Sequence, residues 1–226
     1  MKQNILKKLV LALLLFVGTQ GFAEVWGKVD FAPAYVHIDV LNNNHIVKRM
    51  DMLALKGDAT IIVKDGFCLK PTVMYAANQG DLFTAGLSLG HCFPIADKWI
   101  VTPTIGYSYT YIRTTFKLKD VYYIHHFKER FRSLAPNVGI EIYYQMTDCL
   151  RFCGQMQYAW SKTQTRIKHL IHTNDHARGP LFAALLEYDF NDKVSANLGA
   201  AYNLSLSKEK HGMRGYGAKA GLAYWF

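Results

Sequence analysis

Basic residues are concentrated in two stretches of the second half of the chain, alongside tyrosine and histidine. The first stretch contains Arg113, Lys117, Lys119, Lys128, Arg130 and Arg132. The second contains Lys162, Arg166, Lys168 and Arg178, and a smaller group contains Lys208, Lys210 and Arg214. Guanidinium groups bind phosphate bidentately, and a cationic surface attracts polyanions. The first stretch, with Lys168 and Arg178, is therefore our candidate binding site for an anionic ligand.

Histidines in the second stretch raise two further possibilities. Imidazole and carboxylate groups suit zinc or copper, and four such residues lie close together in the sequence: His169, His172, Asp175 and His176. Their spacing has no helical signature, so we expect solvated histidines, with no metal and no cofactor. A hydrolase or acyltransferase would need a nucleophile beside a base, and the candidates are Ser161 and Ser207 with His172 or His211. No spacing motif joins them, so we assign no catalytic residue.

Two of the four cysteines could pair. Cys68 and Cys92 are placed symmetrically about residue 80, so in a regular hairpin they would face each other across neighbouring strands. A disulfide between them is possible, because cross-strand Cα atoms lie about 5.5 Å apart. Cys149 and Cys153 lie about 13 Å apart along one strand and cannot bridge each other.

Strands must position these residues, because apolar and polar residues alternate along most of the chain. Ten segments alternate in this way: 25–35, 53–63, 67–77, 83–93, 99–111, 134–144, 150–160, 182–190, 194–206 and 216–226. No stretch after Val25 has 18 consecutive apolar residues, so no spanning helix is expected. The composition, with 50% apolar, 14% aromatic and 19% charged residues, excludes a disordered chain.

The connections between these segments alternate between short and long. Four tight turns contain aspartate, at 65–66, 95–97, 147–148 and 191–192, and longer polar segments lie near 39–51, 117–129, 167–179 and 207–212. Short turns at one rim and long loops at the other are typical of a transmembrane, antiparallel up-and-down β-barrel. We predict ten strands, with eight or twelve as alternatives, and both termini on the periplasmic side.

The second face of the strands separates a membrane barrel from a soluble one. A soluble barrel would have a charged outer face, whereas here the face opposite the apolar one is small and polar, as in Thr84, Gly86, Ser88 and Gly90. This composition fits a narrow barrel interior. Aromatic residues lie near both ends of the apolar face, as membrane girdles require.

Strand parity places ten charged residues inside the barrel. They are Lys28, Asp30, Lys56, Asp58, Lys70, Glu141, Arg151, Glu187, Asp189 and Lys219. Five are basic and five acidic, so their charges balance, and buried charges need partners. We expect a lumen filled by ion pairs. The alternative is a narrow, charge-lined channel for small solutes.

Both ends of the chain carry export and assembly patterns. Residues 1–23 have a basic start, an apolar run and the small-residue site Gly21–Ala23, which is typical of a cleaved signal peptide. Residues 24–226 then form a single domain. Alternating apolar residues end at Phe226, which resembles the carboxy-terminal signature of bacterial outer-membrane β-barrel proteins. The resemblance implies that Leu222, Tyr224 and Phe226 are recognised by the barrel-insertion machinery, and that the protein resides in the outer membrane.

The charge of the remaining chain is polarised. The formal net charge of +9 falls to +6 without the signal peptide, and the long-loop end carries +8 against −2 at the short-turn rim. We therefore expect a structural or adhesin-like barrel whose loops contact anionic ligands such as lipopolysaccharide, glycans or a host surface. Membrane lipid would be a further partner, and nucleic acid would not. A channel and an outer-membrane enzyme remain the alternatives.

Overall fold

A computed structural model describes residues 25–119, 124–167 and 171–226. The strands are β1 (Trp26–Asn42), β2 (His45–Ile62), β3 (Phe67–Asn78), β4 (Asp81–His91), β5 (Phe93–Ala96), β6 (Trp99–Lys119), β7 (Ile124–Gln145), β8 (Leu150–Ile167), β9 (Ile171–Asp189), β10 (Val194–Ser207) and β11 (Gly212–Trp225). A single 3-10 turn, η1 (Lys64–Gly66), joins β2 to β3. Among the described residues, no helix is long and apolar enough to cross a membrane.

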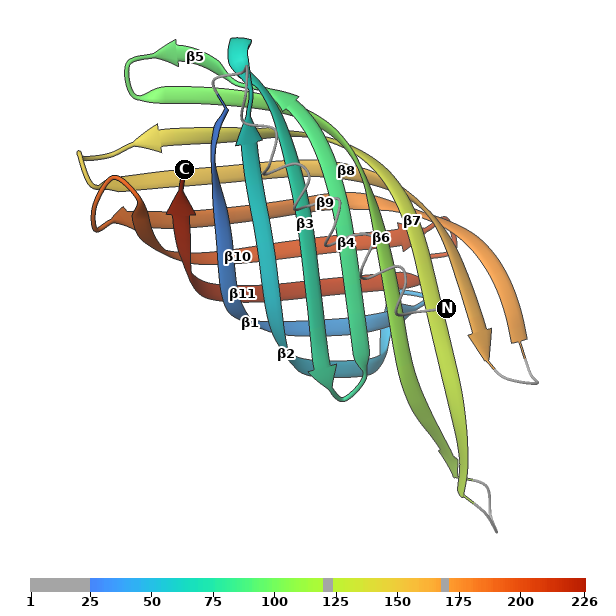
Figure 1. The fold of residues 1–226 in the computed structure, drawn as a ribbon. Helices are drawn as coiled ribbons and strands as arrows, with labels where there is room; N and C mark the ends of the chain where they lie inside the picture. The colour runs from blue at the N-terminus through green and yellow to red at the C-terminus, as the bar shows by residue number, and fades with distance from the viewer. Residues whose placement is uncertain (1–24, 120–123, 168–170) are drawn as a thin grey trace, which may run out of the picture.

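The strands form one closed antiparallel barrel (Figure 1). The last strand returns to the first, since β11 pairs with β1 from Lys28–Trp225 to Leu41–Gly212. Both β4 and the short β5 pair with β6, so together they fill one strand position. Pro94 lies in β5 and has no amide hydrogen to donate, as expected of an edge position. The described chain thus has ten strand positions, as the sequence predicted.

The two ends of the barrel differ. At the short-turn end, the four expected turns are present at η1, Asp97–Lys98, Thr147–Cys149 and Asn191–Lys193. At the opposite end, which we call the hairpin end, the expected loops at 39–51, 117–129 and 167–179 are wrong, because their described parts are mostly strand. In 39–51, polar residues such as Asp39 and Arg49 lie opposite each other on the two strands, so the polar sequence there does not mark a loop. Asn43 and Asn44 close the β1–β2 hairpin with positive φ angles of 48° and 64°.

The hairpins reach different heights. The β3–β4 hairpin turns at Gln79–Gly80, whereas β6 and β7 remain paired as far as Lys119 and Ile124 (Figure 1). Asp81, the first residue of β4, pairs with Arg113 of β6. The part of β6 beyond Arg113 therefore extends past the end of β4. The wall of the barrel is lower at β3–β4 than on either side.

The exterior is apolar and the interior is mixed. Large apolar and aromatic side chains are exposed around the outside of the barrel, including Leu53, Ile105, Leu198 and Leu222. Inside, the half nearer the hairpins contains an apolar cluster that strand parity did not reveal: Ile38, Met50, Met52, Ala54, Ala76, Leu82 and Ile112. Met50 and Met52 are each only 1% exposed. This half thus differs from the small, polar face that the sequence shows on strands such as the one with Thr84, Gly86, Ser88 and Gly90.

Candidate anion-binding site

Three arginines lie side by side on the outside of the barrel because of strand register. Arg113 on β6 pairs with Arg130 on β7, and Arg130 pairs with Arg166 on β8. Adjacent strands are about 4.8 Å apart, so this register concentrates three positive charges in one row. We call Arg113, Arg130 and Arg166 the arginine row. In the sequence, Arg166 belongs to the second basic stretch, and it is not among the predicted ligand-binding residues.

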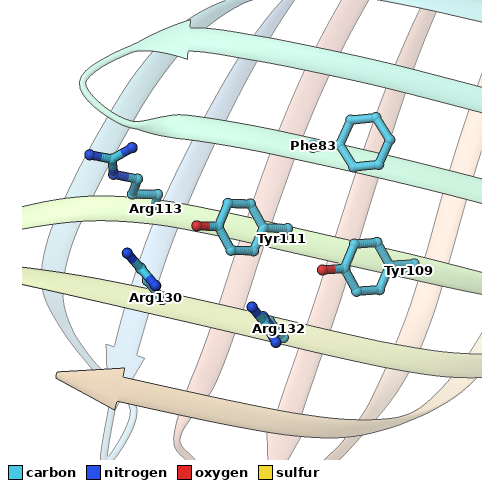
Figure 2. Close-up of a pocket in the computed structure, with 6 residues that line it drawn as sticks. All are labelled: Phe83, Tyr109, Tyr111, Arg113, Arg130 and Arg132. Carbon is cyan, nitrogen blue, oxygen red and sulfur yellow. The ribbon is translucent and has the colours of Figure 1, made fainter. Parts of the chain in front are cut away.

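Aromatic residues lie directly below the arginine row, towards the middle of the barrel wall. Tyr111 pairs with Phe83 on one side and with Arg132 on the other, and the Arg132 guanidinium lies 6.0 Å from the centre of the Tyr111 ring. The Phe83 and Tyr109 rings are 6.4 Å apart. These side chains enclose a shallow hollow of about 410 Å³ (Figure 2). It is lined by Phe83, Tyr109, Tyr111, Arg113, Arg130 and Arg132.

The positive charge of this hollow is not neutralised by the protein. Within the described residues, Arg113, Arg130 and Arg132 form no ion pair with a carboxylate. Asp81 is opposite Arg113 in the β4–β6 register, but its carboxylate accepts a hydrogen bond of 3.3 Å from Tyr75. Like charges directly opposite each other destabilise a sheet. A bound anion would relieve that repulsion.

A second outer cluster, on β1, β2 and β11, has the opposite character. Asp39 accepts hydrogen bonds from Arg214 Nε and Nη2, at 3.1 and 2.7 Å, and lies 3.6 Å from Arg49 Nε. His37 bridges two carboxylates, with Nε2 3.2 Å from Asp39 and Nδ1 2.7 Å from Asp51. The arginines of this cluster are therefore already paired with carboxylates. It is a structural cluster and not a vacant anion site.

Hydrogen bonding also shifts the pKa values of this second cluster. Its hydrogen bond to Asp51 raises the pKa of His37, with burial acting in the opposite direction. Burial would raise the pKa of Asp39, but hydrogen bonds from Arg214 and His37 outweigh it and lower that pKa. The imidazole can donate to both carboxylates only when it is protonated. Both hydrogen bonds, from His37 to Asp39 and from His37 to Asp51, therefore form together only when His37 is charged.

The remaining candidate ligand-binding residues are placed less fully. Lys117, Lys119 and Lys128 occupy positions on the β6–β7 hairpin beyond the arginine row, and only their backbone pairing is described. Lys168 lies outside the described residues. Arg178 is exposed on β9, opposite Trp160. The structure thus brings Arg113, Arg130 and Arg132 together and leaves Arg178 apart from them.

All ten charges expected inside the barrel form ion pairs. Towards the short-turn end, Lys28 lies 2.5 Å from Glu187, and Arg151 contacts both Glu187 and Asp189. Ser195 donates a further hydrogen bond of 2.6 Å to Glu187. Since Lys28 is on β1 and Glu187 on β9, this network passes across two intervening strands. Trp225 lies beneath the cations, with its ring centre 5.1 Å from Lys28 and 4.4 Å from Arg151.

The other lumen charges form two further groups. Lys219 bridges Asp30 at 2.9 Å and Asp58 at 3.2 Å, and Asp58 also pairs with Lys56 at 2.9 Å. Lys70 on β3 pairs with Glu141 on β7, across the strands that lie between them. Glu141 also accepts hydrogen bonds of 3.1 Å from Tyr143 and from Gln155. Together these groups line the lumen with compensated charge, apart from the half that contains the apolar cluster.

The cysteines are all free thiols in the structure. The β3–β4 hairpin is centred on Gln79 and not on Gly80, so Cys68 lies opposite Gly90. The Cys92 amide donates a hydrogen bond of 2.8 Å to the Gly66 carbonyl. Cys68 and Cys92 are therefore diagonal neighbours. The expectation that they face each other directly is wrong, because the turn is centred one residue earlier than expected.

The candidate serines have structural partners. Ser161 is buried and donates a hydrogen bond of 3.0 Å to the Ala177 carbonyl, while Ser207 accepts one of 3.2 Å from the His211 amide in a tight turn. Neither hydroxyl has an imidazole partner in the described part of the chain. His169 lies outside the described residues, and His172 is placed by backbone register alone. No group of three or more metal-ligating side chains occurs among the described residues.

Comparison with solved structures identifies the fold. The outer-membrane protease OmpT from Escherichia coli aligns with a TM-score of 0.59 and 10% sequence identity. The alignment covers 92% of this chain and 99% of the OmpT chain. The chain has the fold of a bacterial outer-membrane β-barrel. The translocator domain of the autotransporter NalP from Neisseria meningitidis aligns with a TM-score of 0.52 and 12% sequence identity. This alignment covers 100% of this chain and 96% of the NalP chain. No family model and no curated protein matches the sequence.

This outer-membrane barrel fold explains the exposed apolar exterior. In this fold the outward side chains contact hydrocarbon, and aromatic girdles mark both interfaces. Phe83, Tyr109 and Tyr111 lie on the outer wall below the arginine row, on the side of the hairpin end, where this fold has one of its two aromatic girdles. At identities of 10% and 12%, the two matches establish the fold alone.

Proposed function

We propose that this chain is an integral outer-membrane barrel whose hairpin end faces outward and contacts an anionic surface ligand. The uncompensated positive charge of Arg113, Arg130 and Arg132 carries the proposal. Arginine forks and adjacent tyrosines suit phosphate or sulfate groups on a sugar or lipid. The role is structural or adhesin-like, with no reaction catalysed.

The lumen argues for this role over a narrow channel. Ion pairs join strands on different sides of the barrel towards the short-turn end, and the methionine-rich cluster fills the other half. Wide aqueous pores are typical of barrels with about 16 strands. We therefore place the function on the outer surface of the barrel.

Binding of a polyanion to the full-length protein tests the proposal. The purified barrel in detergent micelles should bind immobilised heparin at low salt, and the affinity should fall steeply as salt is raised. Membrane fractionation should recover the chain with the outer membrane. Absence from that fraction, or failure to bind heparin and lipid A alike at low salt, would contradict the proposed function.

A further inference from the structure

The hollow below the arginine row lies where outward aromatic side chains give way to arginines, as at the interface of a membrane barrel. Its floor is made by Phe83, Tyr109 and Tyr111, which face outward from β4 and β6 (Figure 2). Two residues along a strand span about 6.6 Å, so Arg113 lies roughly that far from Tyr111 towards water. A group bound by the arginines would therefore lie at the interface while its apolar part contacts the wall below.

The shape of the surrounding wall keeps this position open to the membrane. On the side of β4, pairing stops at Asp81; beyond Arg113, the Thr115 carbonyl of β6 accepts a hydrogen bond of 3.2 Å from Lys48 on β2. On the other side, Arg132 pairs with Gln164, which is neutral. The hollow is thus bordered by neutral or cationic side chains except at Asp81, and it opens outward, away from the lumen.

The paired cluster on the opposite side provides an internal comparison. Arg214 lies at a similar distance from the girdle, beside Tyr216, but its guanidinium is occupied by Asp39. Among the described residues, one outward arginine cluster thus has carboxylate ion-pair partners, whereas Arg113, Arg130 and Arg132 have none. The uncompensated cluster is the one arranged to receive an anion from outside the protein.

We propose that the hollow lined by Arg113, Arg130, Arg132 and Tyr111 binds the phosphate group of a lipid in the leaflet around the hairpin end. This inference rests on the proposed function and specifies its ligand. The guanidinium groups of Arg113 and Arg130 hold the phosphate, and Arg132 over Tyr111 supports the adjoining sugar or glycerol. The acyl chains lie on Phe83 and the apolar wall. A soluble glycan would instead meet the tips of the hairpins.

A comparison of two lipids tests this assignment without any substitution. The full-length barrel in mixed micelles is titrated with bisphosphorylated lipid A and with its dephosphorylated form, and bound lipid is counted by native mass spectrometry. We expect the phosphorylated form to bind at least about tenfold more tightly, the equivalent of one lost charge-assisted hydrogen bond. Equal binding of the two lipids would overturn the proposal.

Substitutions then locate the site. The double variant Arg113→Gln and Arg130→Gln should lose this preference. The control variant Lys208→Gln with Lys210→Gln removes the same charge from exposed positions in the β10–β11 turn and should keep it. Arg113→Lys with Arg130→Lys preserves the charge and provides a folded comparison if the glutamine variant does not assemble. An unchanged preference in the glutamine variant, or its equal loss in the control, would contradict the assignment.

Competition separates the possible sources of the anion. Inorganic phosphate at millimolar concentration should leave lipid binding intact, since it lacks the apolar contacts. Displacement by phosphate would show a site for a free anion and overturn the lipid assignment. Binding of heparin that depends on Arg113 and Arg130, without binding of lipid A, would also overturn it while leaving the proposed function standing.

Discussion

At the scale of single residues, the buried pair of Lys70 and Glu141 is where a substitution should have the largest effect. Both side chains are less than 10% exposed, and they join β3 to β7 across the lumen. Lys70→Met leaves a buried carboxylate without its cation, which costs about 3–5 kcal/mol. We expect lower resistance to urea in detergent micelles, measured by tryptophan fluorescence.

The double variant Lys70→Met with Glu141→Met is the control for that loss. It removes both charges, so most of the stability should return, because well-packed apolar residues can replace a buried pair. If the double variant is as unstable as Lys70→Met alone, the pair does more than compensate charge. Lys162→Met, at an exposed position, should change stability by less than about 0.5 kcal/mol.

His37 should make the outer cluster sensitive to pH. Its pKa is raised in the folded protein by its hydrogen bond to Asp51, so folding takes up a proton there. The stabilisation is complete below the unfolded value of about 6.5 and is lost as the pH rises through the folded pKa. Amide exchange of β1 and β2 near Asp39 and Asp51 should therefore accelerate as the pH rises from 6 to 8, beyond the intrinsic increase. His37→Gln should abolish this extra acceleration, and if it persists in the variant, another group is responsible.

At the scale of the elements, the C-terminal strand closes the barrel and is proposed to direct its assembly. Phe226 and Gly27 exchange backbone hydrogen bonds of 2.9 and 3.0 Å, which complete the β1–β11 seam. Phe226→Ala keeps these bonds and removes only the ring. We expect this variant to fold into lipid vesicles in vitro but to accumulate several-fold less in the outer membrane of cells.

Comparison with an aromatic replacement separates assembly from packing. Phe226→Tyr keeps an aromatic ring at the girdle and should accumulate like the original protein. If Phe226→Ala also accumulated in the outer membrane of cells like the original protein, Phe226 would have no role in assembly. An equal defect in vesicles and in cells would instead make the ring a packing residue, like its exposed neighbours Tyr224 and Leu222.

Strand count and the inward charges could be predicted from sequence because each depends only on local alternation. The arginine row could not, since it depends on the register between β6, β7 and β8, and Arg166 is far from Arg113 in the chain. The apolar lumen cluster was missed for another reason. Met50 lies in a stretch whose polar neighbours indicated a loop, although β2 already begins at His45.

At the scale of the whole molecule, two groups of side chains in the lumen are expected to oppose the passage of ions. Towards the short-turn end, Lys28 reaches Glu187 and Lys70 reaches Glu141 from strands that are not neighbours. Towards the hairpin end, Met50 and Met52 are almost fully buried in the apolar cluster. An ion would have to break compensated ion pairs and then enter an apolar region. Either barrier alone would oppose conduction.

The barrel should therefore be silent in planar lipid bilayers across physiological voltages. The variant with Lys28→Ala, Lys70→Ala, Glu141→Ala and Glu187→Ala together removes both ion pairs that cross the lumen. This variant should remain silent, because Met50 and Met52 still occupy the other half. Adding Met50→Ala and Met52→Ala opens both halves, and only this combination should give conductance steps, provided that it still migrates as a folded barrel. Steps from the unmodified protein would restore the channel hypothesis. They would also move the functional site from the arginine row on the outer wall to the ion pairs of the lumen.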